Sequence, residues 1–552
     1  MWLGMLPQPR FHPLLVISLT ALGACRSADA WGAQADEEVY HILEKRRAEL
    51  GARDAFTIEP PPDPLRARLL AEAAGTHEPL AVALDLVGCL RVAAENSRDW
   101  QDQREQLFRA ALDLTLERWN FSVQENGTLG GFVSGIGFQE ETEVEGGLLS
   151  NLNLFKLLGI GTQITADVGI DLLENLGRGD AWSALTHLSL NITQPILRGF
   201  GSDIVKEPLT QAERDVLYQA RAYERFRRTF SVDIAQRFFR ALEQVDRLKN
   251  EDANLVNLVR LRERNEALAE AGRLTDIQVD QARQDELSAE DRLVAARRDL
   301  EASLDDLKFA LGLPIGIVLE LQENGLRSQE AWPALAGDLS EDLVVGLGLE
   351  KRLDLATARD RVEDASRGVH VAADALRMGM DLSAKGVLLS EGDDPDALRA
   401  SDLDWIVNLD VDLPFDRIPE RNTYRNALII LEERRRAAEE SVDRVTSELR
   451  EALRNRDAAR ASFRIQSGSV VLAQRRVESA ALNLVAGRAS TRDVLEAQES
   501  LLSAQNTLAG ALTDTILAGL FLYRDMELLD VTSDGIEVLQ VGAAPLQLTA
   551  QP

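Results

Sequence analysis

Two distant segments of the chain share one pattern of apolar and polar positions, a strict repeat of seven residues. Val or Leu recurs at one heptad position and Ala at a second, and in the first segment the breaks are Glu286 and Ser303. The first-segment members are Val279, Leu293, Leu300 and Leu307, with Ala282, Ala289, Ala296 and Ala310. The second-segment members are Val494, Leu501, Leu508 and Leu522, with Ala497, Ala504, Ala511 and Ala518. This pattern predicts left-handed coiled coils whose alanine layers let the helices approach closely.

The same two segments open with nearly the same letters, which indicates an internal duplication. "AGRLTDIQVDQARQDELSAEDRL" begins at Ala271, and "AGRASTRDVLEAQESLLSAQNTL" begins at Ala486. Both lie inside long stretches without proline. We therefore predict two long helical hairpins, in which Gly272 and Gly487 supply the backbone freedom that reverses the chain at each tip. The residues that can cap the returning helices are Thr275 and either Ser490 or Thr491.

A weaker repeat precedes each hairpin. "NSRDWQDQREQLFRAALDL" begins at Asn96 and parallels "KRLDLATARDRVEDASRGV", which begins at Lys351. The shared positions are Asp99 and Asp354, Arg104 and Arg359, and Ala110 and Ala365. We expect a shorter pair of helices before each hairpin.

Between the short and long helices, the apolar period changes from that of a helix to that of a strand. The four alternating stretches are "IGTQITADVGI" from Ile160, "ALTHLSLNIT" from Ala184, "MDLSAKGVL" from Met380 and "WIVNLDVDLPF" from Trp405. Strands of about 9–11 residues with one apolar and one polar face fit a transmembrane barrel with a wet lumen. An ordinary half-exposed sheet is the alternative. Four strands cannot close a barrel alone, so the barrel requires an oligomer, and three copies would give twelve strands.

The N-terminus has the pattern of a secretion signal. Arg10 precedes the apolar run "LLVISLTALGA", and "LGAC", which ends at Cys25, resembles a bacterial lipobox. We predict that residues 1–24 are a lipoprotein-type signal peptide and that Cys25 is lipidated; a plain signal peptide cut elsewhere is the alternative. No later stretch offers about 20 apolar residues, so we expect no transmembrane helix in the mature chain. Cys89 lies in an apolar helical setting and is interpreted as a small core residue.

Charge and composition argue against two classes of function. The 61 Lys and Arg stand against 91 Asp and Glu, and the net charge of -30 disfavours a nucleic-acid partner. We find no phosphate loop, no nucleophile–base pairing and no metal-ligand cluster, so we expect no enzyme, no cofactor and no metal site. With 5 His, 2 Cys and 5 Met, a copper-handling route has little support. His41 and His187 are interpreted as surface or lumen residues.

Over roughly residues 80–530, the layout resembles the TolC-like outer-membrane efflux proteins. The motifs that carry the resemblance are "LSLNITQPILRGFG", "KRLDL" and "AGRASTRDVLEAQ". The matching residues of the first motif are Gln194, Pro195, Arg198 and Gly199, and those of the second are Arg352 and Asp354. The resemblance implies a mixed α+β membrane protein that forms a homotrimer. Four strands per protomer would complete a 12-stranded outer-membrane barrel, and the helical hairpins would form a tunnel across the periplasm.

The resemblance also implies roles for the hairpin tips. The tip residues that would dock a periplasmic adaptor protein are Gly272, Arg273, Val279, Gly487, Arg488 and Val494. Asp493 and Glu496 match acidic residues that ring the periplasmic entrance in the family. Carboxylates three residues apart share a helix face, and three copies would make a ring that favours cations. The alternative for this pair is a solvated helix face.

The tips also depart from the family pattern. Leu484 and Ala489 replace the tyrosine and arginine that latch the closed entrance in the best-known member, and Gln278 replaces the acidic residue of the first tip. The closed-state lock is therefore in doubt, unless it is built from Arg273, Arg488 and Arg492.

These observations divide the chain into six parts. They are a signal peptide (1–24), an N-terminal extension and linker (25–79), a first repeat (80–313), an inter-repeat linker (314–340), a second repeat (341–530) and a C-terminal tail (531–552). The stretch 120–158 is longer than one strand needs and is left open between barrel and surface loop.

The expected function is a passive exit duct in the bacterial outer membrane, with a long periplasmic extension. It would serve a tripartite efflux or type I secretion system and contact outer-membrane lipid, a periplasmic adaptor and an inner-membrane pump. The alternative is a lipid-anchored periplasmic coiled-coil adaptor or scaffold.

Overall fold

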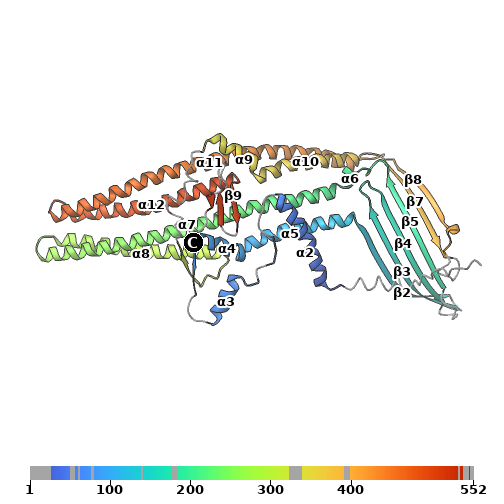
Figure 1. Cartoon of the computed structure of the whole chain (residues 1–552), viewed down its shortest axis with the longest axis horizontal. Helices are drawn as coiled ribbons and strands as arrows, with labels where there is room; N and C mark the ends of the chain where they lie inside the picture. Colours follow the sequence, from blue (N-terminus) through green and yellow to red (C-terminus); the bar gives the residue numbers. More distant parts are fainter. Residues whose placement is uncertain are drawn as a thin grey trace, which may run out of the picture. The chain divides into compact units, whose positions relative to one another are not determined.

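The computed structural model describes residues 26–49, 56–59, 62–75, 80–138, 141–175, 183–322, 339–390, 398–413, 415–532, 535–538 and 546–547. The chain divides into two compact units, each assembled from three stretches of sequence. The first unit comprises Met1–Arg46, Phe108–Gln219 and Asp360–Arg436, and the second comprises Arg47–Leu107, Ala220–Arg359 and Ala437–Pro552. Their helices and strands are labelled in Figure 1.

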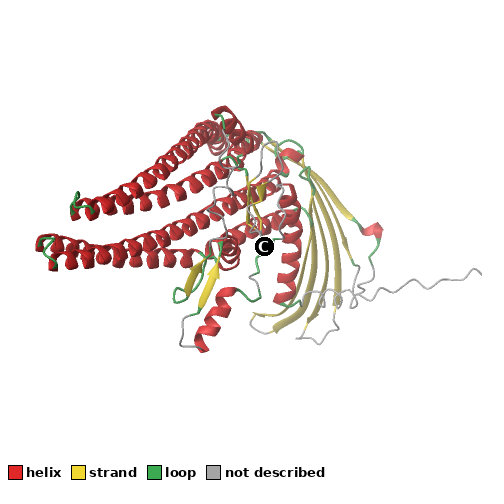
Figure 2. Cartoon of the chain, turned by 60° about the vertical axis from the view of Figure 1, so that its left-hand side comes forward, coloured by secondary structure: helices red, strands yellow, loops and turns green. Residues whose placement is uncertain are grey.

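The first unit is built around an antiparallel sheet of six strands. In order across the sheet they are β2 (Val123–Phe138), β3 (Glu141–Leu157), β4 (Gln163–Asn175), β5 (Ser183–Pro195), β7 (Gly379–Leu389) and β8 (Asp404–Asp412). Each strand pairs antiparallel with the next. The sheet therefore joins strands from both sequence repeats, and Figure 2 shows it as one curved surface.

The prediction of four strands per protomer is wrong, because the structure adds a hairpin in front of them. The four predicted strands are β4, β5, β7 and β8. The stretch left open by the sequence forms β2 and β3, which pair from Val123 with Lys156 to Phe138 with Glu141. Five of the 16 residues of β2 are glycines. Glycine carries no side chain, so the alternation that marks a strand is weak in this stretch.

The pairing register gives the sheet one apolar face that extends across all six strands. Val168 on β4, for example, lies opposite Leu152 on β3 and Leu188 on β5. Large side chains on this face that remain exposed are Val123, Leu129, Val133, Leu148, Val168, Leu190, Ile192, Leu382, Trp405, Val407, Leu409 and Val411. The added hairpin therefore shares the apolar face of the other four strands.

The opposite face of the sheet is mainly polar. Asp167 on β4 accepts a hydrogen bond from Asn153 on β3 at 2.5 Å and another from Ser189 on β5 at 3.1 Å. The hairpin is thus joined to the predicted strands through side chains as well as through the backbone ladder.

Helices α7 (Glu207–Glu270) and α10 (Leu353–Asp374) contribute an ionic cluster to the first unit. Arg214 lies 2.9 Å from Glu363 and 3.2 Å from Asp364. The Tyr218 hydroxyl donates to Asp364 at 2.5 Å. Burial and this hydrogen bond raise the pKa of Tyr218 to about 12. The cluster connects the two sequence repeats within the unit.

The second unit contains the tips and most of the length of the two predicted helical hairpins. In the first, α7 is followed by α8 (Asp276–Ala310); in the second, α11 (Ile418–Val485) is followed by α12 (Thr491–Asp525). Corresponding helix ends lie 215 positions apart, since α7 and α11 end at 270 and 485 and α8 and α12 end at 310 and 525. The duplication inferred from the sequence is therefore confirmed in the helix boundaries.

The alanine positions of the heptads are buried within the second unit. The buried members are Ala282, Ala289, Ala296, Ala497, Ala504, Ala511 and Ala518. A polar network lies between the two hairpins: Asn250 donates to Asn506 at 3.0 Å, and Asn506 donates to Glu251 at 3.2 Å. Burying these groups is favourable only in the register that pairs them, so the network specifies how the hairpins align.

The weaker repeat is also visible in the helix boundaries. Helix α4 (Leu86–Asn96) leads into α5 (Arg98–Asn120), and α9 (Glu341–Lys351) leads into α10. Both breaks have an extended residue at the C-cap, Ser97 in the first repeat and Arg352 in the second. Cys89 on α4 is fully buried, which confirms it as a core residue, and burial raises the pKa of its thiol.

Regions interpreted as an extension, a linker and a tail also contain secondary structure. The N-terminal extension contains helices α2 (Ala28–Glu49) and α3 (Leu65–Gly75). The inter-repeat linker contains strand β6 (Val318–Leu321), which pairs in parallel with β1 (Ala81–Leu84). In the C-terminal tail, strands β10 (Gly535–Val538) and β11 (Leu546–Gln547) form a small sheet with β9 (Leu529–Thr532). Of the helices in the described ranges, none is long and apolar enough to cross a membrane.

Candidate functional site

In the first unit, the motif "LSLNITQPILRGFG" forms the junction between β5 and the short helix α6 (Ser202–Val205). The amide of Gln194 accepts a hydrogen bond from the Thr162 hydroxyl and donates to the carbonyl of Pro195 at 2.6 Å. Arg198 lies 3.1 Å from Asp412, the last residue of β8. The motif therefore connects the end of β5 with the end of a strand from the other repeat.

Two glycines make this junction unusually tight. Gly199 has a φ of 77°, and its N–H donates to the buried Asp374 of α10 at 2.7 Å. Gly161, with a φ of 96°, is so close that an added Cβ would lie 2.6 Å from the Gly199 carbonyl oxygen. Glycine is therefore required at position 161 both by the backbone conformation and by the lack of space.

The two hairpin tips in the second unit have the same backbone geometry. Gly272 and Gly487 adopt φ values of 70° and 69°. The next residues, Arg273 and Arg488, donate their N–H groups to carbonyls five residues earlier, each at 2.8 Å. This is the hydrogen-bond pattern of a Schellman motif, in which a left-handed glycine ends the helix. A Cβ at either glycine would meet nothing within 4 Å, so both tips are open.

Asp493, one of the predicted entrance residues, caps the N-terminus of α12. Asp493 and Ser490 form a reciprocal capping box, in which Asp493 accepts from the Ser490 N–H at 2.7 Å. This backbone hydrogen bond and that from the Ser490 hydroxyl lower the pKa of Asp493. Glu496 is exposed and lies 3.0 Å from Arg492. At the other tip Thr275 occupies the N-cap position without a capping bond from its side chain.

The two tips differ in how their valines are buried. Val494 is 3% exposed, whereas its counterpart Val279 is half-buried. Beside Val494, the buried Thr491 accepts a hydrogen bond from Asn265 of α7 at 3.3 Å. Part of the second tip therefore packs against the first hairpin. This difference between the tips could not be predicted from their matching sequences.

The "KRLDL" motif lies in a chain of ion pairs in the second unit. Arg352 is 3% exposed, pairs with Asp354 at 2.7 Å and reaches Glu448 of α11 at 2.5 Å. Asp354 in turn lies 3.5 Å from Arg225 of α7. Burial raises the pKa of Asp354, but the hydrogen bond from Arg352 and the charge of Arg225 outweigh it, so the pKa is lowered. The motif joins three helices.

The polar face of the sheet carries mostly negative charge. Its acidic residues on β4, β7 and β8 are Asp167, Asp171, Asp381, Asp404, Asp410 and Asp412. Within the described strands, the basic side chains on this face are His187 and Lys385, and His187 lies 3.8 Å from Asp171. An aqueous lumen lined by this face would attract cations.

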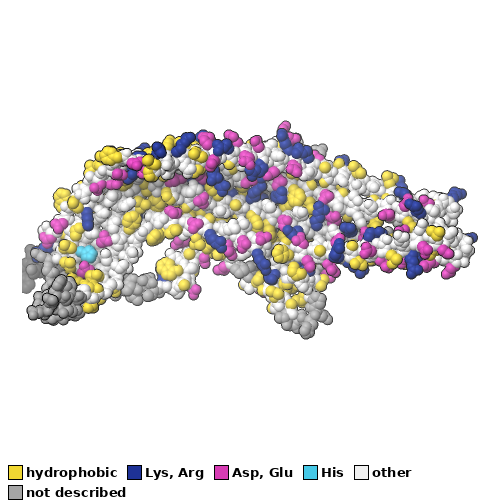
Figure 3. Space-filling view, turned by 180° about the vertical axis from the view of Figure 1, so that it is seen from behind, with side chains coloured by type: hydrophobic (Ala, Val, Ile, Leu, Met, Phe, Trp, Pro, Cys, Tyr) yellow, Lys and Arg dark blue, Asp and Glu magenta, His cyan; other side chains and the backbone are white. Residues whose placement is uncertain are grey.

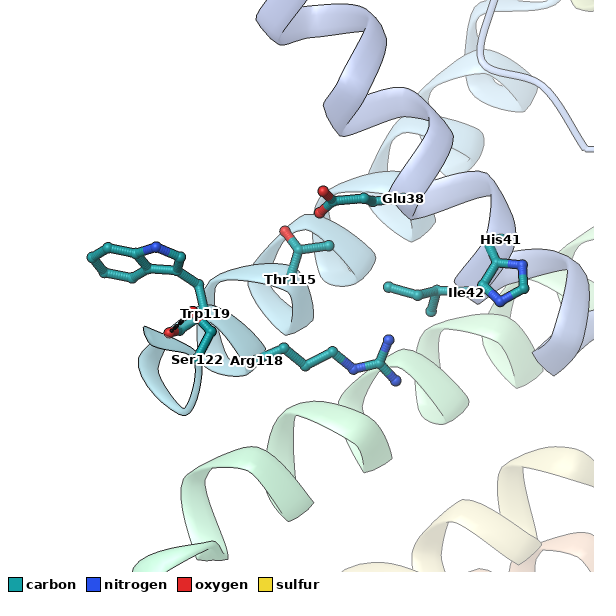
Figure 4. Close-up of a pocket in the computed structure, with 7 residues that line it drawn as sticks. All are labelled: Glu38, His41, Ile42, Thr115, Arg118, Trp119 and Ser122. Atoms are coloured by element: carbon teal, nitrogen blue, oxygen red, sulfur yellow. Dashed lines mark hydrogen bonds between the residues drawn. The ribbon is translucent and has the colours of Figure 1, made fainter. Parts of the chain in front are cut away.

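A surface groove of about 390 Å³ lies between α2 and the end of α5 in the first unit. Figure 4 shows Glu38, His41 and Ile42 on α2, with Arg118 extending beneath Ile42. Trp119 at the end of α5 is half-exposed. On the face drawn in Figure 3, acidic and basic side chains are interspersed along the helices.

Two predictions from the sequence concern a lipidation site and metal binding. Cys25, the predicted lipidation site, lies outside the described residues. Among the described side chains, no group of three or more His, Cys, Asp or Glu could hold a metal ion.

Comparison with known proteins agrees with this arrangement. The profile of the outer membrane efflux protein family matches residues 163–313 and 344–524. No curated protein matches the sequence. Among solved structures, CusC is similar with a TM-score of 0.60 and 17% identity, covering 80% of this chain and 91% of that one.

Two outer membrane proteins of named bacteria have similar TM-scores. The Vibrio cholerae outer membrane protein VceC has a TM-score of 0.58 and 17% identity, over 80% of this chain and 95% of its own. The Campylobacter jejuni CmeC outer membrane channel has a TM-score of 0.57 and 15% identity, over 80% and 85%. The ranges that the family profile matches include strands β4, β5, β7 and β8 and both helical hairpins.

Proposed function

The chain belongs to the outer membrane efflux protein family, and from this premise we propose that three copies form a passive exit duct through the bacterial outer membrane. The strands would cross the membrane, and the helical hairpins would extend into the periplasm. A periplasmic adaptor and an inner-membrane pump would supply cargo and energy, as in a tripartite efflux or type I secretion system. The observation that carries the proposal is the sheet of the first unit, apolar on one face and acidic on the other.

Exposed apolar side chains support a membrane setting for this sheet. On β8, Trp405 is 73% exposed and Leu409 is 58% exposed, both on the apolar face. At the helical ends of the strands, Trp119, Phe200 and Phe415 are 52%, 47% and 96% exposed. Membrane barrels combine such an apolar band with aromatic residues at its borders. In water, a patch of this extent would be a liability for aggregation.

Exposed apolar residues on the hairpins support assembly with further copies. On α8, Leu287 and Val294 are 59% and 65% exposed and lie seven residues apart. On α11, Ile465 and Leu472 are 67% and 65% exposed and have the same spacing. Heptad stripes that find no partner within one protomer fit against neighbouring helices in a coiled-coil wall. We propose a homotrimer, the number that the family resemblance implies.

We propose that the two tips dock the adaptor. Gly272 and Gly487 are open, and Arg273 and Arg488 beside them are exposed. Two tips of similar backbone geometry in each protomer would present six ends in a trimer. The contributions of Val279 and Val494 would differ, because Val494 is already buried within the protomer.

We propose that Asp493 and Glu496 line the periplasmic entrance and favour cations. Asp493 stays ionised at neutral pH because its pKa is lowered, and an ionised ring is what a cation filter requires. The acidic face of the sheet would continue this preference in the barrel. Lipidation at Cys25 would add an anchor to the same membrane.

The test is single-channel recording from the full-length protein, purified in detergent and inserted into a planar bilayer. Cation-selective pores from a trimeric species are the expected result. A protein that becomes soluble without detergent once Cys25 is replaced by Ser, and that never conducts, would support the lipid-anchored scaffold instead. Opening variants at the tips separate a closed entrance from a scaffold, because only a duct begins to conduct when its entrance is loosened.

A further inference from the structure

Among the strands that the structure describes, the two at the edges of the six-stranded sheet, β2 on one side and β8 on the other, have no strand partner on their outer side. Every strand between them pairs on both sides. An open edge is not tolerated in a bilayer, because its N–H and C=O groups find no water there. If the sheet crosses the membrane as proposed above, both edges need a partner.

The direction of the two edge strands suits them to each other. Six strands alternate in direction across the sheet, so β2 and β8 run antiparallel. Val123 at the start of β2 follows α5 closely, and Asp412 at the end of β8 closely precedes α11. The helix-linked ends of both edge strands therefore lie at the same end of the sheet. The β8 strand of one copy can pair antiparallel with the β2 strand of the next without inverting either copy.

The side-chain pattern of the edge strands also matches. Leu129 and Val133 on β2 are each 73% exposed on the apolar face. On β8, Val407 and Leu409 are exposed on the same face. If the apolar side chains of both strands face the lipid, the register can change only by two residues at a time. A shift of one residue would turn the apolar side chains of one strand toward the lumen.

We propose that β8 of each protomer pairs with β2 of the next, so that three protomers close a barrel of eighteen strands rather than twelve. This inference rests on the proposed duct. Barrel diameter grows roughly linearly with strand number, so the bore would be about half as wide again as that of a twelve-stranded barrel. The added β2–β3 hairpin is then part of the channel wall, and this duct would have an unusually wide outer mouth.

The competing arrangement leaves the hairpin outside the barrel and lets β8 pair with β4 of the neighbour. That arrangement requires β4 to give up its ladder with β3, which extends from Glu145–Asn175 to Leu157–Gln163. It would also break the hydrogen bond between Asn153 and Asp167. These costs favour the eighteen-stranded closure.

Disulfide trapping in outer-membrane vesicles tests the pairing with the full chain. One cysteine is fixed on β8 by Val407→Cys, and a second is moved along β2. The apolar-face positions to scan are Gly127→Cys, Leu129→Cys, Gly131→Cys and Val133→Cys. The matched controls are Thr128→Cys and Gly130→Cys, which lie between them on the opposite face. We expect oxidation to give covalent dimers and trimers for one apolar-face position, or for two that are neighbours in register, and for neither control.

Three results would overturn the pairing. Cross-links from Val407→Cys to Ala166→Cys or Val168→Cys on β4 would show the twelve-stranded closure. Equal cross-linking of both faces would show that no ordered ladder joins the copies. The third is no inter-subunit cross-link at any scanned position. A cryo-EM map of the unsubstituted trimer is an independent test, because the strands of the barrel can be counted in it. We expect eighteen strands, and a barrel of twelve would contradict the proposal.

The outcomes also separate this inference from the proposed function. A conducting trimer with β8–β4 cross-links leaves the duct in place and removes only the eighteen-stranded closure. A non-conducting monomer without cross-links removes both.

Discussion

Arg225 of α7 and Glu527, in the turn that follows α12, form an ion pair in the second unit. Their side chains meet at 2.7 Å, and the Glu527 side chain is 3% exposed. The second carboxylate oxygen lies 2.7 Å from Arg228. Glu527 has a φ of 58°, a left-handed conformation that disfavours any residue with a Cβ. Two arginines therefore hold Glu527 in a left-handed conformation that a glycine would adopt without strain.

The first prediction concerns this turn. Glu527→Ala should destabilise the second unit by about 2–3 kcal/mol, because it removes the charged hydrogen bonds from Arg225 and Arg228 to a buried carboxylate, although Arg225 keeps Asp354 at 3.5 Å. The measurement is thermal unfolding of the detergent-solubilised protein, followed by helical circular dichroism. The matched control is Asp514→Ala, which breaks the more exposed pair with Arg240 at 2.7 Å. That control should cost less than about 1 kcal/mol.

A second variant separates charge from backbone strain. Glu527→Gly also removes the ion pair but relieves the left-handed conformation, so its melting temperature should lie between those of wild type and Glu527→Ala. A melting temperature of Glu527→Ala equal to that of Asp514→Ala would contradict the importance of the ion pair.

The long elements of this fold could be predicted from the sequence because their signals are local and repeated. The heptad repeats predicted the hairpins, and two glycines in matching sequence contexts predicted the positions of the tips. Four strands were predicted from alternation alone. The β2–β3 hairpin was missed because glycines such as Gly127 and Gly131 interrupt that alternation. The β1–β6 pair was missed because it joins strands more than two hundred residues apart, and neither strand has a pattern of its own.

The second prediction concerns the strand-to-helix junction. Gly161→Ala should strongly reduce the yield of folded protein, because its Cβ would lie 2.6 Å from the Gly199 carbonyl oxygen at a φ of 96°. Gly127→Ala, in the β2 strand, is the control, since a Cβ there meets nothing within 4 Å. We expect the control to assemble normally. Outer-membrane yield and heat-modifiable trimer migration measure the difference, and equal yields would show that the junction adapts.

The candidate site could be predicted only in part, for a physical reason. The repeated motif predicted the tip glycines at the helix break, whereas the acidic pair was proposed from the family resemblance and stays a prediction. It could not identify the capping role of Asp493, which depends on the backbone angle at Ser490, nor the contact of Thr491 with Asn265. The ion pairs of Arg352 and Arg225 were missed as well, because they join helices that are far apart in sequence.

The third prediction is a pH dependence at the start of α12. The pKa of Asp493 is lowered in the folded state, so its capping contribution is complete above the ordinary pKa of about 3.9. It is lost as the pH falls through the lower folded value. Hydrogen exchange in the first turn of α12, corrected for intrinsic rates, should therefore rise below about pH 4. Asp493→Asn should abolish this step because it cannot titrate.

The first turn of α8 is the internal control for that experiment. Its N-cap residue, Thr275, makes no side-chain capping bond, so its exchange should change less over the same pH range. Steps of equal size at both helix starts would assign the effect to general acid unfolding rather than to the capping box.

The fourth prediction tests the proposed acidic entrance. Asp493→Asn combined with Glu496→Gln should lower the cation-to-anion permeability ratio in a planar bilayer, because both replacements remove charge while keeping the shape of the side chain. The amide at position 493 can still accept from Ser490, so the helix start is preserved. Glu290→Gln on α8, an exposed acid away from the tip, is the control. An unchanged ratio in the double variant would refute the ring.

The fifth prediction separates adaptor docking from assembly at the second tip. Gly487→Trp places a large side chain on an open surface, so it should block docking and abolish export while the trimer still forms. The left-handed backbone is itself a source of strain for Trp, and Gly487→Asn is the control because asparagine tolerates this conformation. We expect Gly487→Asn to retain export, and cross-linking to the adaptor in cells to follow the same order. A Gly487→Trp protein that assembles and exports at the wild-type level would show that the adaptor does not bind this tip. Loss of trimers in Gly487→Trp alone would instead trace the defect to the hairpin turn, and Gly272→Trp would then repeat the test at the first tip.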